Sequence, residues 1–190
     1  MYDGRQDAID EDEQVMGSVR LTPADIRRLF ELLDEELARE GAEGELYLVG
    51  GAVMCLVLEA RFATRDVDAF FRPTRVMREA AARVADRAGV PRSWLNDSVK
   101  AFLGTHGEFD PYLELPHLRV FVARTEYLLA LKCVAMRLGA EFQDLDDVQF
   151  LLRYLDITEA EEALEVILRY FDEAQIPPKT RFALEEILGG

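Results

Sequence analysis

The chain has 190 residues, of which 49% are hydrophobic, and a formal net charge of −15. This length suits one domain or a core with a helical extension, and no run of about 18 apolar residues indicates a membrane span. The negative charge argues against non-specific nucleic-acid binding, and the acidic N-terminus does not resemble a secretory signal. Cys55 and Cys133 lie far apart in apolar segments and suit core thiols. We therefore expect a cytoplasmic protein with no membrane partner.

The first ordered element is predicted to be an amphipathic helix. Residues 1–20 are acidic and lack a hydrophobic period, which predicts a disordered tail. Thr22, Pro23 and Asp25 then form a helix start, because threonine suits the N-cap, proline the first helical position and an acid the third. Apolar residues at helical spacing follow, and Gly41 ends the segment.

Two hydrophobic segments of strand length come next. Residues 45–49 predict a strand, Gly50 and Gly51 predict a tight turn, and residues 52–59 predict a buried helix. A second strand is predicted at residues 66–71. The sequence therefore predicts a strand–turn–helix–strand unit.

Two aspartates alternate with apolar residues in the second of these strands. Side chains at positions i and i+2 of a strand point to the same face, so Asp66 and Asp68 are expected to project together. Two ionised carboxylates repel each other, and burying an unpaired charge is costly. We therefore expect the pair to hold a hard divalent cation, Mg²⁺ or Mn²⁺.

The remaining segments are mainly helical. A helix is predicted at 74–88, a short helix or irregular segment at 93–103, and a third strand at 118–122. Four further helices are predicted at 125–138, 144–155, 158–174 and 178–188. The expected fold class is α+β, with a small mixed sheet in a core of residues 21–124 and a helical C-terminal region at 125–190.

Positive charge gathers in one part of this acidic chain. The arginines there are Arg61, Arg65, Arg72, Arg75, Arg78, Arg83, Arg87 and Arg92. Arginine suits bidentate contacts with phosphate. We favour a role in the site for Arg61 and Arg65, which lie beside the aspartates. Arg78, Arg83 and Arg87 suit a solvated helix face.

The order of strand, Gly50-Gly51, helix and Asp66-X-Asp68 strand resembles the polymerase-β-like nucleotidyltransferase fold. The resemblance implies that the glycine turn lets the backbone approach a nucleoside triphosphate. It also implies that Asp66 and Asp68 hold the metal ions. Neither motif is specific alone, but their order and spacing together are.

Further motifs extend the resemblance over about residues 45–155. They are Arg61-X-X-Thr64, Trp94-Leu95-Asn96-Asp97, Tyr127-Leu128-Leu129-Ala130-X-Lys132 and Asp144-X-X-Asp147. These motifs are similar to those of the bacterial AbiEii-type toxin nucleotidyltransferases and their relatives. The similarity implies Mg²⁺- or Mn²⁺-dependent transfer of a nucleoside monophosphate from an NTP to an RNA, such as a transfer RNA, or to another cellular acceptor. It also implies the toxin role in a toxin–antitoxin pair, with an antitoxin protein as partner.

The same resemblance suggests a role for each motif residue. The catalytic residues are Asp66, Asp68, Lys132 and Asp147, with Asp66 and Asp68 as metal ligands. The nucleotide-binding residues are Gly50, Gly51, Arg61, Thr64, Arg65, Asn96 and Asp144. Three of these polar side chains also suit a purely structural role: Lys132 could extend from an apolar helix to the surface, and Asp144 and Asp147 could favour a helix N-terminus.

Two departures from the family pattern leave a second hypothesis open. Many active members have Gly-Ser where this chain has Gly50-Gly51, and the third carboxylate of the fold has no clean counterpart. Residues 118–122 contain no acid, and Glu114 precedes them near a proline. Without that acid the usual general base is missing. The alternative is a catalytically weak nucleotide-binding or protein-interaction module on the same fold.

Overall fold

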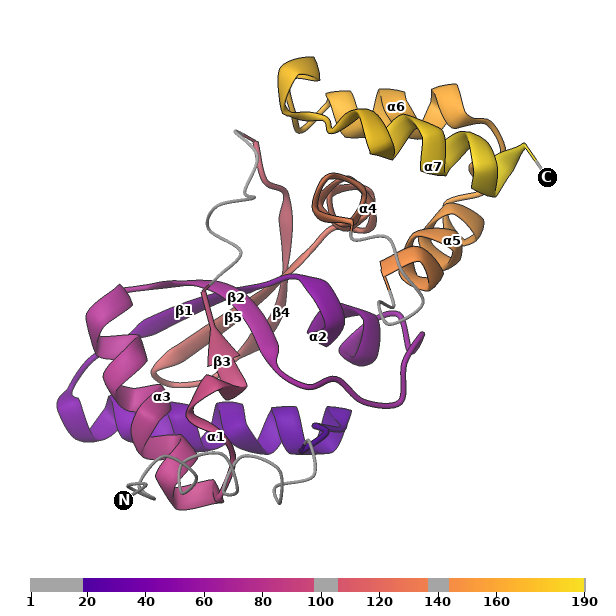
Figure 1. The fold of residues 1–190 in the computed structure, drawn as a ribbon. Coiled ribbons are helices and arrows are strands. Elements are labelled where there is room, and N and C mark those ends of the chain that lie inside the picture. The colour runs from indigo at the N-terminus through magenta and orange to yellow at the C-terminus, as the bar shows by residue number, and fades with distance from the viewer. Residues whose placement is uncertain (1–18, 98–105, 137–143, 190) are drawn as a thin grey trace, which may run out of the picture.

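The computed structural model describes residues 19–97, 106–136 and 144–189, and within them the fold is α+β, as predicted (Figure 1). Five strands form one mixed sheet in the order β3-β2-β1-β5-β4. Strand β1 is antiparallel to β2 and parallel to β5. At the two edges of the sheet, β3 is parallel to β2 and β4 is antiparallel to β5. The strands are β1 Gly44–Leu48, β2 Val67–Arg72, β3 Leu95–Asn96, β4 Phe109–Glu114 and β5 Leu118–Ala123.

Helices lie on both sides of this sheet. Helices α1 and α3 run together below it, and α4 to α7 gather above its other end (Figure 1). Their bounds are α1 Pro23–Glu40, α2 Gly50–Leu56, α3 Thr74–Ala88, α4 Thr125–Ala135, α5 Asp144–Tyr154, α6 Ala160–Leu168 and α7 Pro178–Leu188. Short 3-10 helices occur at Arg92–Trp94 and Glu173–Gln175.

The start of α1 confirms the predicted cap. The Thr22 hydroxyl accepts a hydrogen bond from the Asp25 N–H at 3.2 Å, and the Thr22 N–H donates to the Asp25 carboxylate at 2.9 Å. Gly41 ends the helix in the left-handed region with φ 61°, where glycine carries no steric penalty. The predicted bounds of α3 and α7 are also confirmed.

Two strands were not predicted. Residues 93–103 were expected to be a short helix or irregular, but they include the end of a 3-10 helix and then β3, and residues 98–103 lie outside the described residues. Strand β4 contains Pro111, where the pairing register with β5 shifts. A two-residue strand has no periodicity to detect, and a proline argues against a strand assignment.

Several predicted helix ends also differ from the structure. Helix α2 begins at Gly50 and ends at Leu56, instead of following the glycines and reaching residue 59. Helix α6 ends at Leu168, so the predicted helix at 158–174 is too long. Helix α4 ends at Ala135, and the predicted end at 138 lies outside the described residues. Most of the predicted tail, residues 1–18, lies outside them too.

Alternation along β2 separates the two faces of the sheet. Val67, Ala69 and Phe71 are buried, whereas Asp68 and Phe70 on the opposite face are only partly buried. The buried set faces the layer of α1 and α3, and these side chains belong to one hydrophobic core that extends from Leu21 to Leu184. The sheet and the C-terminal helices therefore share one core.

Aromatic side chains join the second face of the sheet to the C-terminal helices. Tyr47 stacks on Phe121 with ring centroids 4.8 Å apart, and the edge of Phe109 meets Tyr47 at 5.2 Å. Phe109 also contacts Tyr127 on α4, which contacts Tyr170 after α6. These contacts fix the helical region over the β4–β5 side of the sheet.

The side chains of the only tryptophan and the two cysteines are buried. The Trp94 indole donates a hydrogen bond to the Ala81 carbonyl on α3 at 3.0 Å, which anchors the chain just before β3. Burial raises the pKa of the Cys133 thiol to about 12, and Cys55 is equally inaccessible. The prediction of core thiols is confirmed. Among the described residues, no helix combines the length and apolar character that crossing a membrane requires.

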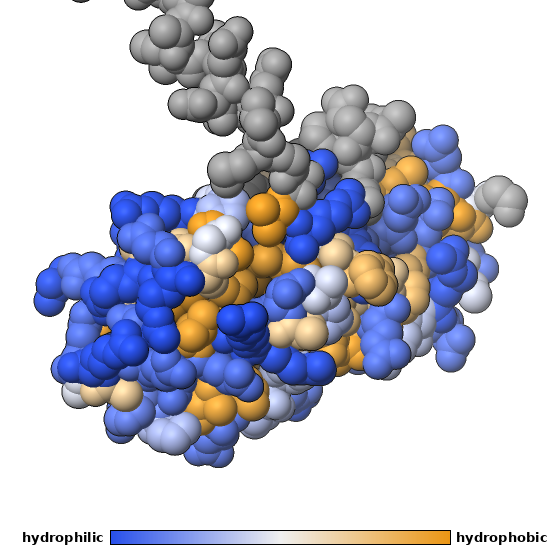
Figure 2. Space-filling view, turned by 90° about the horizontal axis from the view of Figure 1, so that it is seen from below, coloured by the Kyte–Doolittle hydropathy of each residue, from blue (hydrophilic) through white to orange (hydrophobic). Residues whose placement is uncertain are grey.

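Helices α1 and α3 are joined by ion pairs around a buried glutamate. Glu36 is 3% exposed and receives hydrogen bonds from Arg83 at 3.0 Å and Arg87 at 2.6 Å, as well as from Arg39. The face that these helices present is largely hydrophilic (Figure 2). The arginines expected on a solvated helix face are thus paired: Arg83 and Arg87 with Glu36, and Arg78 with Asp97.

Replacing Glu36 with glutamine should destabilise the fold in a pH-dependent way. Burial raises the pKa of Glu36, but hydrogen bonds from Arg87 and Arg83 outweigh this and leave it lowered. The ionised carboxylate therefore stabilises the fold above its ordinary pKa of 4.5, and this contribution is lost as the pH falls through the lowered folded value. We expect a loss of about 1–3 kcal/mol at pH 7, measured by urea unfolding, and a smaller difference at low pH. Glu31→Gln, on an exposed part of the same helix, should change little.

Candidate functional site

The predicted carboxylate pair lies at the start of β2. Asp68 is in the strand and Asp66 immediately precedes it. Burial raises the pKa of Asp66, and the negative charge of Asp68 raises it further. The charges of Arg65 and Lys132 and a hydrogen bond from Asn96 oppose this rise without cancelling it. The two carboxylates are thus close enough for the charge of Asp68 to disfavour the ionised form of Asp66.

Gly50 lies against this pair. A Cβ atom on Gly50 would be 2.8 Å from Asp68 Oδ2, and the residue has φ +60°, a conformation that favours glycine. The Val49 N–H donates to the Asp68 carbonyl at 3.0 Å, which holds the two segments together. The absence of a side chain at Gly50 therefore makes room for the Asp68 carboxylate.

Gly51 makes room for a different side chain. A Cβ atom on Gly51 would lie 2.5 Å from Thr64 Oγ1 and 3.6 Å from an Arg61 guanidinium nitrogen. Thr64 is itself fixed, because its N–H and carbonyl both bond to the backbone of Leu21, at 3.0 and 2.7 Å. Both glycines belong to the first turn of α2, and Gly51 is needed there for packing against the loop that leads to β2.

A second cluster surrounds Asp147 on α5, which is 3% exposed. Its Oδ1 accepts a hydrogen bond from Arg61 Nε at 2.8 Å, and its Oδ2 lies 2.7 Å from Lys132 Nζ. Lys132 Nζ is also 3.7 Å from Asp144 Oδ1. The loop after α2, helix α4 and helix α5 therefore meet at one buried carboxylate.

Lys132 connects the two clusters electrostatically. Its charge lowers the pKa of Asp66 while its ammonium contacts Asp147. The side chain is 14% exposed, so it does not extend freely into solvent. The predicted residues fall into two groups. One group contains Asp66, Asp68, Asn96 and Gly50, and the other contains Arg61, Lys132, Asp144 and Asp147. Gly51 of α2 packs against Thr64 of the loop that leads to β2.

The carboxylate pair fits a hard divalent cation in ligand type. Asp66 and Asp68 offer oxygen ligands, and a bound cation would relieve the repulsion that raises the pKa of Asp66. Within the described residues there is no group of three or more histidine, cysteine, aspartate or glutamate side chains arranged to hold a metal. The described residues thus place two carboxylates, Asp66 and Asp68, at this position.

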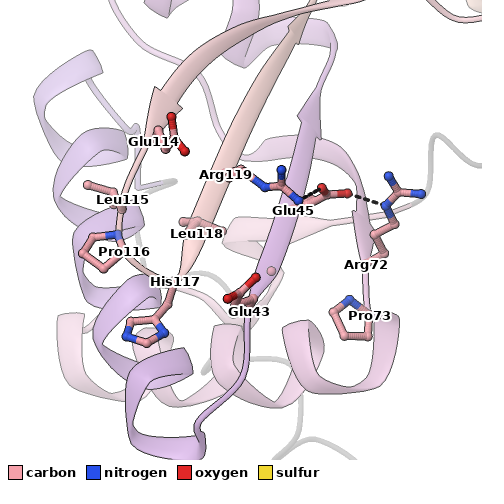
Figure 3. Close-up of a pocket in the computed structure, with 11 residues that line it drawn as sticks. Glu43, Glu45, Arg72, Pro73, Glu114, Leu115, Pro116, His117, Leu118 and Arg119 are labelled. Atoms are coloured by element: carbon pink, nitrogen blue, oxygen red, sulfur yellow. Dashed lines mark hydrogen bonds and ion pairs between the residues drawn. The ribbon is translucent and has the colours of Figure 1, made fainter.

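A polar cavity of about 460 Å³ lies at the other end of β1 and β2 (Figure 3). Glu45 lies between Arg72 and Arg119 there, hydrogen bonded to Arg119 at 2.5 Å and to Arg72. Glu114 lines this cavity, so it does not supply a third acid to the pair. The cluster was not predicted, because its members are far apart in sequence and no local motif joins them. None of the predicted site residues lines this cavity.

Comparison of the chain with protein-family models, with curated proteins and with solved structures gives no match.

Adding a side chain at Gly51 should destabilise the fold through Thr64. Gly51→Ala should cost about 1–3 kcal/mol by overpacking, although alanine has the better helix propensity. In a Thr64→Ala background the loss should be smaller, because the atom nearest to the new Cβ is gone. Urea unfolding of the four chains in this double-mutant cycle measures the coupling. Equal losses in both backgrounds would contradict the proposed contact.

Replacing Asp66 with asparagine should stabilise the metal-free protein at neutral pH. The pKa of Asp66 is raised above its ordinary 3.8, so ionised Asp66 costs stability at pH values above the folded pKa. The variant should therefore melt higher at pH 7, by about 2–4 °C for each kcal/mol relieved, and the difference should disappear near pH 3. Thermal melts in EDTA test this expectation. Asp86→Asn, at an exposed carboxylate, is the control, and an equal or lower melting temperature for Asp66→Asn would contradict it.

Proposed function

We propose that the chain is a divalent-metal-dependent nucleotidyltransferase of the polymerase-β-like type. The observation that carries this proposal is the pair of Asp66 and Asp68 at the start of β2, close enough that the charge of Asp68 opposes ionisation of the partly buried Asp66. A fold that keeps two such charges together loses stability unless a cation binds there. The resemblance of the motifs to AbiEii-type toxin nucleotidyltransferases then suggests the reaction class.

In this proposal the side chains have distinct roles. Asp66 and Asp68 would hold Mg²⁺ or Mn²⁺, which supplies charge neutralisation for the phosphates of an NTP. Lys132 is a candidate for a direct phosphate contact, since its charge acts on Asp66. Asp147 orients that lysine through the 2.7 Å ion pair, and it also fixes Arg61. Arg65 contributes a further positive charge beside the pair.

The acceptor and partner follow from the same resemblance. It suggests an RNA, such as a transfer RNA, as the acceptor of the nucleoside monophosphate, and an antitoxin protein as the partner. The net charge of −15 repels a polyanion such as RNA. We therefore expect the acceptor to be recognised at a defined local surface and not by non-specific electrostatic attraction.

One observation favours the second candidate, a catalytically weak nucleotide-binding or protein-interaction module. Arg61 and Lys132, the cations expected to meet phosphate, are both bonded to Asp147. Phosphate would have to share or displace these contacts. The described residues also contain no group of three histidine, cysteine, aspartate or glutamate side chains that could hold a metal. The third carboxylate of the fold, the usual general base for a hydroxyl acceptor, therefore has no counterpart in such a group.

The two candidates differ in labelling of RNA. The wild-type chain, incubated with radiolabelled NTPs, Mg²⁺ and total cellular RNA, should label RNA. Asp66→Asn and Asp68→Asn should each lower this rate by about 100-fold or more, as expected for removal of a group that acts in the transition state. The two variants should keep the wild-type fold by circular dichroism.

The control for this assay is Asp110→Asn, which removes an exposed carboxylate on β4 that is paired with Arg124. It should label RNA at the wild-type rate. Nucleotide binding without labelling, measured by calorimetry, would contradict the transferase and support the binding module. Labelling that survives in both aspartate variants would contradict the assigned site.

A further inference from the structure

Asn96 contacts the carboxylate pair from the neighbouring strand. Strand β3 is parallel to β2, with Asn96 in register with Asp68. From this position the Asn96 side chain reaches Asp66, and its Nδ2 donates a hydrogen bond to Asp66 Oδ2 at 3.0 Å. Asn96 therefore lies beside one aspartate through the backbone register and bonds the other through its side chain.

This hydrogen bond acts on the charge of the pair. The amide N–H donates to one oxygen of the Asp66 carboxylate and stabilises the negative charge there. The bond also restricts the rotation of the Asp66 carboxylate, because one of its oxygens is held by a group on another strand. Hydrogen bonds that orient a ligand in this way commonly tune metal affinity.

The residue type at this position sets the total charge of the three side chains. Asparagine is neutral, so Asp66, Asp68 and Asn96 together carry two negative charges when both acids are ionised, which matches one divalent cation. An aspartate at position 96 would place a third carboxylate beside Asp68. The neutral side chain keeps the metal-free site from a third repulsive charge.

We propose that Asn96 is the third member of the cation site, a positioning residue that orients Asp66 and keeps the site matched to one divalent cation. This inference rests on the cation site of the proposed function but not on nucleotidyl transfer. It replaces the nucleotide-binding role that the motif suggested for Asn96. The backbone at Asn96 is also held in place, because the Trp94 indole two residues earlier donates a hydrogen bond to the Ala81 carbonyl.

Mn²⁺ binding to the full chain tests the proposal without any measurement of activity. Isothermal titration and the electron paramagnetic resonance signal of free Mn²⁺ give the affinity. Asn96→Ala should bind Mn²⁺ about 10–100-fold more weakly than wild type, as is typical when an orienting hydrogen bond is lost. Asn96→Asp should bind it at least as tightly as wild type, because it adds an anionic oxygen ligand.

Thermal melts give the second measurement. In EDTA, Asn96→Asp should melt at a lower temperature than wild type. The variant places three carboxylates close together and lacks the amide donor to Asp66. In Mn²⁺ its melting temperature should rise by more than that of wild type. The control Asp86→Asn, at an exposed carboxylate paired with Arg92, should match wild type in both conditions.

The possible outcomes separate this proposal from the proposed function. Wild-type affinity for Mn²⁺ in Asn96→Ala, with only a lower melting temperature, would show a purely structural role and overturn the proposal. Weaker binding by Asn96→Asp than by Asn96→Ala would also overturn it, and so would the absence of Mn²⁺ binding by wild type at millimolar concentration. The expected Mn²⁺ affinities together with no RNA labelling would support the role of Asn96 while contradicting the transferase.

Discussion

The ion pairs of Asp147 are the constraint on which the arrangement of the site depends. A carboxylate that is 3% exposed needs cationic partners, and here they come from two other segments, the loop after α2 and helix α4. Removing one partner of a buried ion pair generally costs about 3–5 kcal/mol, because the other charge is left uncompensated. The C-terminal helices are therefore tied to the loop that leads into β2, and this tie brings Lys132 toward Asp66.

The same constraint has a cost for phosphate binding. Lys132 and Arg61 are held in place by ion pairs with Asp147 that also neutralise them, so a triphosphate in the proposed site would have to compete with Asp147 for both. The charge of Arg65 lowers the pKa of Asp66 more than the charge of Lys132 does. Cations that are fixed by an ion pair are well oriented toward a ligand, but less of their positive charge remains for it. This balance explains why one arrangement is compatible with both a transferase and a binding module.

Local features of the fold could be predicted from the sequence, and non-local ones could not. The cap of α1 depends on Thr22 and Asp25, which are three residues apart. The proximity of Asp66 to Asp68 needs only their spacing along the chain, although β2 begins at Val67 and leaves Asp66 outside the predicted strand. Strand β3 has two residues and β4 contains Pro111, so neither carries a clear period. Strand β3 is formed by pairing with β2, which lies far away in the sequence, and β4 pairs with the adjacent β5 through a register shift at Pro111. A local pattern encodes neither feature.

The candidate site shows the same division. The motif resemblance suggested the residues of the candidate site, including Lys132 and Asp147, but not the contacts among them. The hydrogen bond of Asn96 to Asp66 depends on the parallel register of β2 and β3. The lack of room for a side chain at Gly51 depends on Thr64, which the backbone of Leu21 holds in place. The ion pairs of Arg83 and Arg87 with Glu36 likewise require two helices to be packed first.

The buried indole of Trp94 is an intrinsic fluorescence probe of this protein. It is the only tryptophan in the chain, and it lies two residues before Asn96, with its N–H bonded to α3. Intrinsic tryptophan fluorescence therefore comes from a single point between α3 and the start of β3, without a contribution from the C-terminal helices. A change in emission wavelength reports solvent entry at the edge strand, so events at the site are distinguishable from events in the helical region without any label.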